Sequence, residues 1–193
     1  MKSVAVFCAS SLGKNKIYEE TAIALGNKIA TKGMRLVYGG AKVGLMGAVA
    51  NGALQNGGKV IGVIPGFLRT KEVAHEGLTE LILTETMQER KTKMHELSDS
   101  VITLPGGFGT MEEMFEMLTW GQLGMHKKPM GLLNIDGYYN SLVTLINDMV
   151  TKGLLKEVNR EMLLVSEDID DLLAQMQAYK APEVEKWITK DKA

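Results

Sequence analysis

The chain has 193 residues, 45% of them hydrophobic, and its 22 basic and 23 acidic side chains leave a formal net charge of -1. This length suits one domain with a single core, and the balanced charge excludes the broad basic surface typical of DNA- and RNA-binding proteins. The single cysteine, Cys8, excludes a disulfide framework, and no apolar run approaches the roughly 20 residues of a membrane helix, so we expect a soluble cytoplasmic protein without membrane contacts.

Short apolar runs without alternation mark the expected strands, at residues 4–8, 35–38, 60–64, 81–83, 101–104, 131–135 and 162–165. Such runs are typical of strands covered on both faces. Helical spacing is found between most of them and at the end, at residues 18–31, 45–55, 87–97, 111–123, 139–151 and 169–179. This alternation predicts an α/β fold with a mainly parallel sheet of about seven strands. We assign residues 1–180 to one domain and 181–193 to a C-terminal tail.

In such a sheet, ligands bind outside the carboxyl ends of the strands, so the turns after residues 8, 38 and 104 are the places to search for chemistry. The third turn reads Pro105-Gly-Gly-Phe-Gly-Thr110 and leads directly into a predicted helix. Its glycines permit close backbone approach, and free N–H groups at the helix start suit a phosphate. The alternative is an ordinary capping box, with Thr110 as N-cap and Glu113 bonding back to it. Spacing alone does not separate the two.

Two glutamates, Glu112 and Glu113, follow in the first turn of this helix and would repel an anion bound there, so a compensating cation is expected. Arg90 and Lys91 are the candidates. Arg90 falls on an apolar helix face with Met94, where an arginine needs a partner. A purely structural ion pair is the alternative.

The helix after the third turn is apolar on more than one side. Glu113 shares one face with Met117 and Trp120, which favours a position at a shielded pocket. Met114 and Phe115 lie on the other apolar face, and we expect one of the two faces to contact a second subunit.

The second turn, residues 38–47, lacks both the spacing of a dinucleotide fingerprint and the Lys-Ser/Thr ending of a P-loop. It can contact a nucleotide, or its glycines can serve strand-helix packing alone. The first turn offers only the hydroxyls of Ser10 and Ser11. The histidines are scattered and no nucleophile elbow occurs, so we expect neither a metal site nor a cofactor.

Several of these motifs together resemble the Lonely Guy (LOG) family. Its Pro-Gly-Gly-x-Gly-Thr-x-x-Glu signature is matched throughout by residues 105–113, and Met87-Gln-Glu-Arg-Lys91 matches its upstream signature. The likeness extends from Val-Phe-Cys-Ala-Ser-Ser near the start to Gly131-Leu-Leu-Asn-Ile-Asp-Gly-Tyr-Tyr139. One departure is Ala41, where many members have a third glycine after Gly39 and Gly40.

This resemblance implies a Rossmann-like, three-layer homodimer that acts as a phosphoribohydrolase. Such an enzyme releases free base and ribose 5-phosphate from cytokinin riboside 5'-monophosphates, and often from AMP. By the same likeness, Arg90 and Glu113 are the catalytic pair. The implied substrate-binding residues are Glu72, Arg90, Lys91, Gly107, Phe108, Gly109, Thr110, Met111, Glu112, Glu113 and Thr119.

Two other functions stay open from the sequence. A non-catalytic purine nucleotide sensor would use the same phosphate loop without cleaving its ligand. A pyridoxal-phosphate decarboxylase would also need a phosphate site, but no lysine lies in a recognisable Schiff-base setting.

Overall fold

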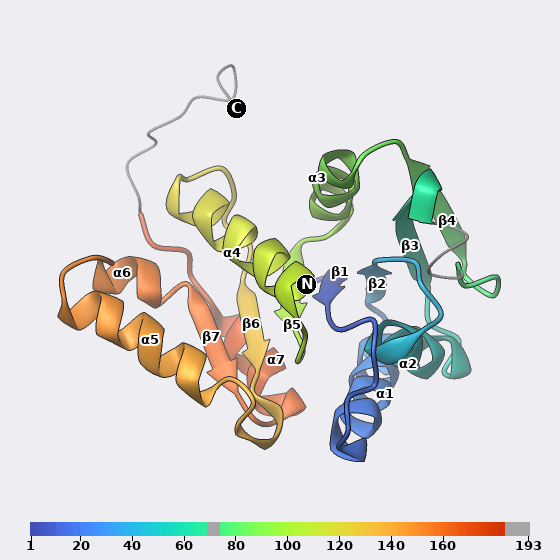
Figure 1. Ribbon diagram of the computed structural model, residues 1–193, viewed down its shortest axis with the longest axis horizontal. Helices are drawn as coiled ribbons and strands as arrows, with labels where there is room; N and C mark the ends of the chain where they lie inside the picture. Colours follow the sequence, from blue (N-terminus) through green and yellow to red (C-terminus); the bar gives the residue numbers. More distant parts are fainter. Residues whose placement is uncertain (69–73, 184–193) are drawn as a thin grey trace.

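The computed structural model describes residues 1–68 and 74–183 (Figure 1). Glu72, one of the expected substrate-binding residues, and residues 184–193 of the expected tail lie outside the described residues. Seven strands form one sheet in the order β4-β3-β2-β1-β5-β6-β7, and every neighbouring pair is parallel. The predicted α/β fold with a mainly parallel seven-stranded sheet is confirmed.

The predicted strands and helices are all present, with most ends shifted by one to three residues. The strands are β1 (Ser3–Phe7), β2 (Arg35–Tyr38), β3 (Val60–Pro65), β4 (Glu80–Thr84), β5 (Ser100–Thr103), β6 (Met130–Leu133) and β7 (Leu163–Ser166). The helices are α1 (Lys16–Thr31), α2 (Gly44–Gln55), α3 (Met87–Leu97), α4 (Phe108–Gln122), α5 (Asn140–Thr151), α6 (Glu157–Arg160) and α7 (Ile169–Ala178), with 3-10 turns η1 (Gly66–Leu68) and η2 (Ile135–Gly137). The sequence did not predict α6, η1 or η2, because three or four residues carry too little periodicity.

Helices cover both faces of the sheet and produce three layers. Strand β1 shows the division, because Val4 and Val6 belong to the core on the side of α1, α2 and α7. Ala5 and Phe7 belong to the core on the side of α3 and α4, and a third cluster joins α4 to α5 and β6. All five residues of β1 are buried, which explains why its sequence is continuously apolar after Ser3.

The strand order places a crevice at the centre of the sheet. From β1 the chain runs outward through β2 and β3 to β4, and then α3 returns it to β5 on the other side of β1 (Figure 1). The direction of strand addition therefore reverses between β1 and β5. Parallel sheets bind ligands at the carboxyl ends of strands at such a point.

Candidate active site

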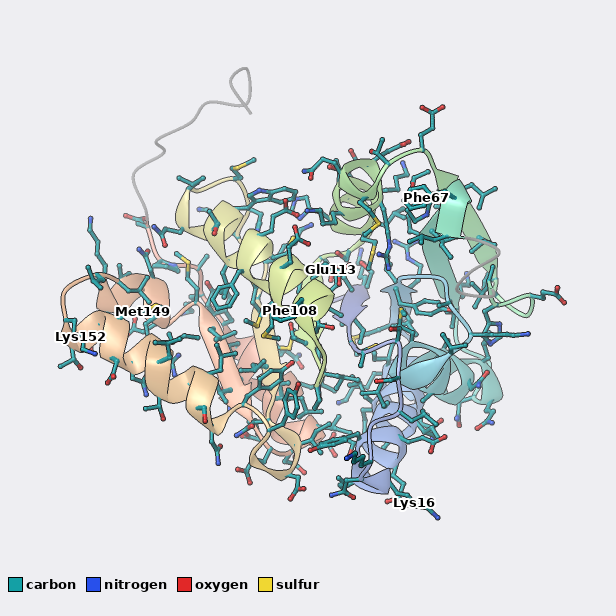
Figure 2. All side chains as sticks on the ribbon, in the orientation of Figure 1. Lys16, Phe67, Phe108, Glu113, Met149 and Lys152 are labelled. Carbon is teal, nitrogen blue, oxygen red and sulfur yellow. The ribbon has the colours of Figure 1, made fainter. Side chains whose placement is uncertain are left out.

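A cavity of about 360 Å³ lies at this switch point, between the ends of β1 and β5 and the helices α3 and α4. Figure 2 shows Phe108 and Glu113 on the part of α4 nearest to β1. The first and third turns, α3, and Gly39 and Met46 of the second turn all line the cavity. Its lining includes Cys8, Ser10, Ser11, Gly39, Met46, Leu68, Met87, Arg90, Met94, Gly107, Phe108, Gly109, Thr110, Glu112 and Glu113.

Helix α4 begins at Phe108, with Gly107 as an N-cap that has no side chain to close the helix end. The capping-box alternative is wrong, because Thr110 is the third residue of the helix rather than its cap, and it is buried. Gly107, Phe108 and Gly109 are exposed at the cavity. The first N–H groups of a helix have no acceptor within the helix, and they form the positive end of its dipole. The turn therefore presents donors suited to an anion.

The third turn has a close-packed floor on the side away from solvent. A Cβ added at Gly106 would lie 2.1 Å from the Thr110 Oγ1, so only glycine fits over this buried threonine. The Ala9 N–H donates to the Pro105 carbonyl at 3.1 Å, which ties the turn to the end of β1. Sequence and packing together hold the start of α4 against the first turn.

Arg90 and Glu113 form a buried ion pair across the cavity. The Arg90 Nη1 lies 3.6 Å from the Glu113 Oε1, and the two residues are only 7% and 8% exposed. The Arg90 Nε donates to the Val63 carbonyl at 3.1 Å, so β3 holds the guanidinium in place. A Cβ at Gly39 would lie 2.0 Å from the Arg90 Nη2, so this glycine leaves the space that the guanidinium occupies.

Cys8 lies at the base of the same cavity, within electrostatic reach of both members of the pair. Burial raises the pKa of its thiol well above the ordinary value, Glu113 raises it further, and Arg90 lowers it. The thiol is therefore protonated at neutral pH and is unsuited to act as a nucleophile. The sequence did not predict a place for Cys8 in the site, because a single cysteine in an apolar run is expected to be an ordinary core residue.

Comparison of the sequence with known proteins shows the family to which the chain belongs. A family model described as "Possible lysine decarboxylase" matches residues 46–176. The chain is 44% identical to the cytokinin riboside 5'-monophosphate phosphoribohydrolase LOG7 of Arabidopsis thaliana over 93% of this chain and 82% of that protein. It is 47% identical to a cytokinin riboside 5'-monophosphate phosphoribohydrolase of Rhodococcoides fascians over 92% of this chain and 90% of that one. The chain belongs to the LOG family.

The fold is also shared outside close relatives of the LOG family. The Moco carrier protein of Chlamydomonas reinhardtii superposes with a TM-score of 0.69 at 23% identity, over 92% of this chain and 98% of that one. At this identity the likeness concerns the fold alone.

Among the residues that the LOG signatures single out, Lys91 does not line the cavity within the described residues. Its ammonium contacts the Glu112 Oε1 at 2.5 Å and the Glu116 Oε1 at 3.0 Å, and the residue is 9% exposed. Burial lowers the pKa of Lys91, but the hydrogen bonds to Glu112 and Glu116 outweigh this and leave the pKa raised. Lys91 thus offsets the charge of Glu112, the glutamate expected to repel an anion.

Two other expected contact residues also lie away from the cavity lining. Met111 packs against the core cluster between α4 and α5. Thr119 is exposed three helical positions before the end of α4, and its hydroxyl donates to the Phe115 carbonyl at 2.8 Å. Their role in binding substrate stays a prediction.

The second glycine-rich turn serves packing at the start of α2. The Ala9 carbonyl accepts from the Leu45 N–H at 3.1 Å, so the N-terminus of α2 is bonded to the first turn. A Cβ at Gly44 would lie 2.2 Å from the Ser10 carbonyl carbon, and one at Gly47 would lie 2.0 Å from the Lys42 carbonyl oxygen. Of the two interpretations of these glycines, close packing accounts for Gly44 and Gly47.

Across residues 1–68 and 74–183, no group of three or more histidine, cysteine, aspartate or glutamate side chains is arranged to hold a metal ion. In the same part of the chain, no helix is both long and apolar enough to cross a membrane.

Proposed function

We propose that this LOG-family chain hydrolyses the N-glycosidic bond of a purine nucleoside 5'-monophosphate, releasing free base and ribose 5-phosphate. The substrate is a cytokinin riboside 5'-monophosphate, as the names of the relatives state for those proteins, or AMP. The observation that carries the proposal is that one cavity contains both an open helix N-terminus and a buried Arg90–Glu113 pair. We place the reaction in the cytoplasm, and it needs no cofactor.

The start of α4 is the proposed anchor for the 5'-phosphate. The amides of Phe108, Gly109 and Thr110 have no acceptor within the helix, and all three residues line the cavity. A phosphate bound there fixes one end of the nucleotide and places the ribose over the next turn of α4. Such positioning replaces a bimolecular encounter by a reaction within a fixed complex.

Glu113 is the proposed catalytic carboxylate, one helical turn beyond Gly109. As the N-glycosidic bond breaks, its electron pair leaves with the base nitrogen and positive charge develops on the ribose. A buried carboxylate stabilises this charge, orients a ribose hydroxyl or accepts a proton from the attacking water. Water then adds to the anomeric carbon as hydroxide, and its proton balances the charge on the departing base.

Arg90 is the proposed partner of both Glu113 and the substrate anion. Its Nη1 is 3.6 Å from the carboxylate, which is within ion-pair range but longer than a hydrogen bond. The Nε donates to the Val63 carbonyl, and Arg90 lines the cavity beside Glu113. The pair therefore presents a fixed charge pattern before substrate arrives.

The decarboxylase alternative lacks a suitable lysine. None of the described residues that line the cavity is a lysine, and Lys91 is held by Glu112 and Glu116. A Schiff base needs an amine that can deprotonate, whereas the raised pKa of Lys91 keeps it charged.

The homodimer expected from the family resemblance is part of the proposal. Large apolar side chains are exposed on η1, α3 and α4: Phe67 is 58% exposed, Met87 38%, Phe108 98% and Phe115 37%, and of these Met87 and Phe108 line the cavity. Figure 2 labels Phe67 near the ends of β3 and β4, and Phe108 on α4. Neighbouring exposed apolar residues favour burial against another protein surface. Light scattering of the purified chain distinguishes a dimer from a monomer.

The decisive experiment incubates the purified chain with AMP and, separately, with isopentenyladenosine 5'-monophosphate, and resolves the products by chromatography. The proposal predicts equal amounts of free base and ribose 5-phosphate from at least one nucleotide, and the ratio of kcat/KM values identifies the preferred base. Nucleotide binding by calorimetry without any product after prolonged incubation would favour the sensor instead. Failure to bind either nucleotide would contradict both functions.

A further inference from the structure

The segment 134–139, Asn-Ile-Asp-Gly-Tyr-Tyr, is part of the family likeness but has no place in the mechanism above. It forms the turn η2 between β6 and α5, away from the cavity lining. Yet both of its tyrosines reach residues 104–107, which lead from β5 into α4 and which we call the phosphate turn. The Tyr138 hydroxyl donates to the Gly106 carbonyl at 2.7 Å, and the Tyr139 hydroxyl donates to the Leu104 carbonyl at 2.7 Å.

Three consecutive carbonyls of the phosphate turn therefore have donors from outside it. Leu104 is bonded by Tyr139, Pro105 by the Ala9 N–H at 3.1 Å, and Gly106 by Tyr138. A buried carbonyl needs such a partner, and a glycine-rich turn has few side chains of its own to restrict its backbone. The orientation of this turn is thus imposed by η2 and the end of β1.

The bond from Tyr138 also sets the direction of an N–H group at the cavity. The carbonyl of Gly106 and the N–H of Gly107 belong to one peptide unit, and no peptide bond is cis among the described residues. In a trans unit the two groups point in opposite directions. When Tyr138 holds the carbonyl on one side, the Gly107 N–H is directed to the other, and Gly107 lines the cavity.

The two tyrosines are themselves held rigidly. The Asn134 Oδ1 accepts from the Tyr139 N–H at 2.7 Å, and its Nδ2 donates to Asn140 at 2.7 Å. The backbone reverses at Asp136 and Gly137, which have φ angles of +53° and +67°. The rings of Tyr138 and Tyr139 meet edge to face with centroids 4.8 Å apart. A rigid donor can fix a peptide plane, whereas a mobile one cannot.

We propose that Tyr138 and Tyr139 are positioning residues that orient the 105–107 turn for the 5'-phosphate, with Tyr138 setting the Gly107 N–H. This inference rests on the proposed function, because it assumes that a phosphate binds at the start of α4. The two tyrosines differ in burial. Tyr139 is 2% exposed and also supports the fold, whereas Tyr138 is 45% exposed and acts mainly through its one hydrogen bond.

The test is Tyr138→Phe, which removes the hydroxyl and keeps the ring. We expect an unchanged melting temperature, and a KM for AMP and an inhibition constant for ribose 5-phosphate that each rise roughly 3- to 10-fold, the effect of one hydrogen bond. The kcat value and inhibition by free adenine should stay near the wild-type values, because the loss affects phosphate binding in the ground and transition states alike. Tyr179→Phe, the same change outside the cavity and the turn, is the matched control.

Tyr139→Phe is a second variant. We expect it to have a lower melting temperature and, like Tyr138→Phe, a higher inhibition constant for ribose 5-phosphate. Wild-type constants for AMP and ribose 5-phosphate in Tyr138→Phe would overturn the inference. An equal weakening of adenine inhibition would also overturn it, since a general distortion does not select the phosphate.

If the wild-type chain binds AMP without cleaving it, the proposed catalysis fails. Calorimetry with AMP then tests the tyrosines alone, with weaker binding to Tyr138→Phe as the expected result and equal binding as the contrary one.

Discussion

The Arg90 guanidinium lies 3.6 Å from the Glu113 carboxylate, and neither residue is more than 8% exposed. Two charges removed from water at this separation are strongly coupled, because the surrounding dielectric is low. The pair is supported by the Val63 carbonyl and faces the open end of α4. Because the Arg90 charge offsets that of Glu113, one cavity can contain both an anion site and a carboxylate.

Glu113→Gln should abolish base release while leaving the fold intact. The amide keeps the size of the side chain but removes the charge that stabilises the ribose and accepts a proton. We expect kcat for AMP to fall by about 10²- to 10⁴-fold, as for other losses of a catalytic acid or base. Product release is measured by chromatography, and circular dichroism checks the fold. Glu20→Gln, an exposed site on α1, is the control. Full activity in Glu113→Gln would remove this residue from the mechanism.

The energetic coupling of Arg90 and Glu113 can be measured by a double-mutant cycle. Arg90→Gln alone removes the guanidinium charge from beside the buried Glu113 carboxylate and should cost about 3 kcal/mol of unfolding free energy. Adding Glu113→Gln should recover part of that loss, with an interaction term of about 1–3 kcal/mol. Urea denaturation of the four proteins provides the values. Additive losses would show that the pair does not act as a unit.

Gly39→Ala tests whether the missing side chain at Gly39 fixes the position of the Arg90 guanidinium. The added Cβ would lie 2.0 Å from the Arg90 Nη2 and 2.9 Å from the Met46 sulfur, so the guanidinium must move. We expect a stability loss of about 1–3 kcal/mol and a fall in kcat/KM. Gly121→Ala in α4, where the nearest atom would be 3.4 Å away, is the matched control and should be neutral or stabilising. Retained activity in Gly39→Ala would show that Arg90 tolerates displacement.

A histidine cluster at the far end of α4 predicts an acid-sensitive fold. Burial, with Lys128 and His126 nearby, lowers the pKa of His95 to about 4 from the 6.5 expected in the unfolded chain. Between these values the unfolded state binds the proton and the native state does not, so this contribution to stability is lost as pH falls from 6.5 to 4. His95→Gln should therefore flatten the dependence of melting temperature on pH in that window. If melting temperature depended on pH in the same way for the wild type and for His95→Gln, this prediction would be wrong.

The seven strands and the six longer helices followed from the sequence because each has a distinct hydrophobic pattern. Fully buried strands such as β1 and β5 have nearly continuous apolar runs, and glycine or proline marks several other boundaries, as at Gly33, Pro65 and Pro105. The start of α4 was misjudged by three residues because Thr110 and Glu113 match a capping box. Gly107 caps the helix instead, and Thr110 turns inward beneath Gly106. Sequence spacing identifies the residues that could cap a helix, but tertiary packing determines which residue is the cap.

The site was predictable only in part, for a related reason. The need for a compensating cation pointed to Arg90 and Lys91, and the resemblance to the LOG family paired Arg90 with Glu113. By contrast, Gly39 and Cys8 enter the cavity through contacts between elements distant in sequence. The hydrogen bonds from Tyr138 and Tyr139 depend likewise on how η2 sits beside the phosphate turn. No periodicity along the chain encodes such distances.

The central position of β1 has a consequence for how the molecule acquires activity. Arg90 is on α3, before β5, whereas Glu113 and the phosphate turn come after β5. They meet only when β5 pairs with β1, which joins Val4 to Ser100 across almost half of the chain. Strands β1 to β4 leave the ribosome first and can associate without forming any part of the ion pair. Closure of that long loop is slow compared with local pairing. Catalysis should thus be among the last properties to return during refolding, and its recovery marks the moment when the two halves of the sheet join.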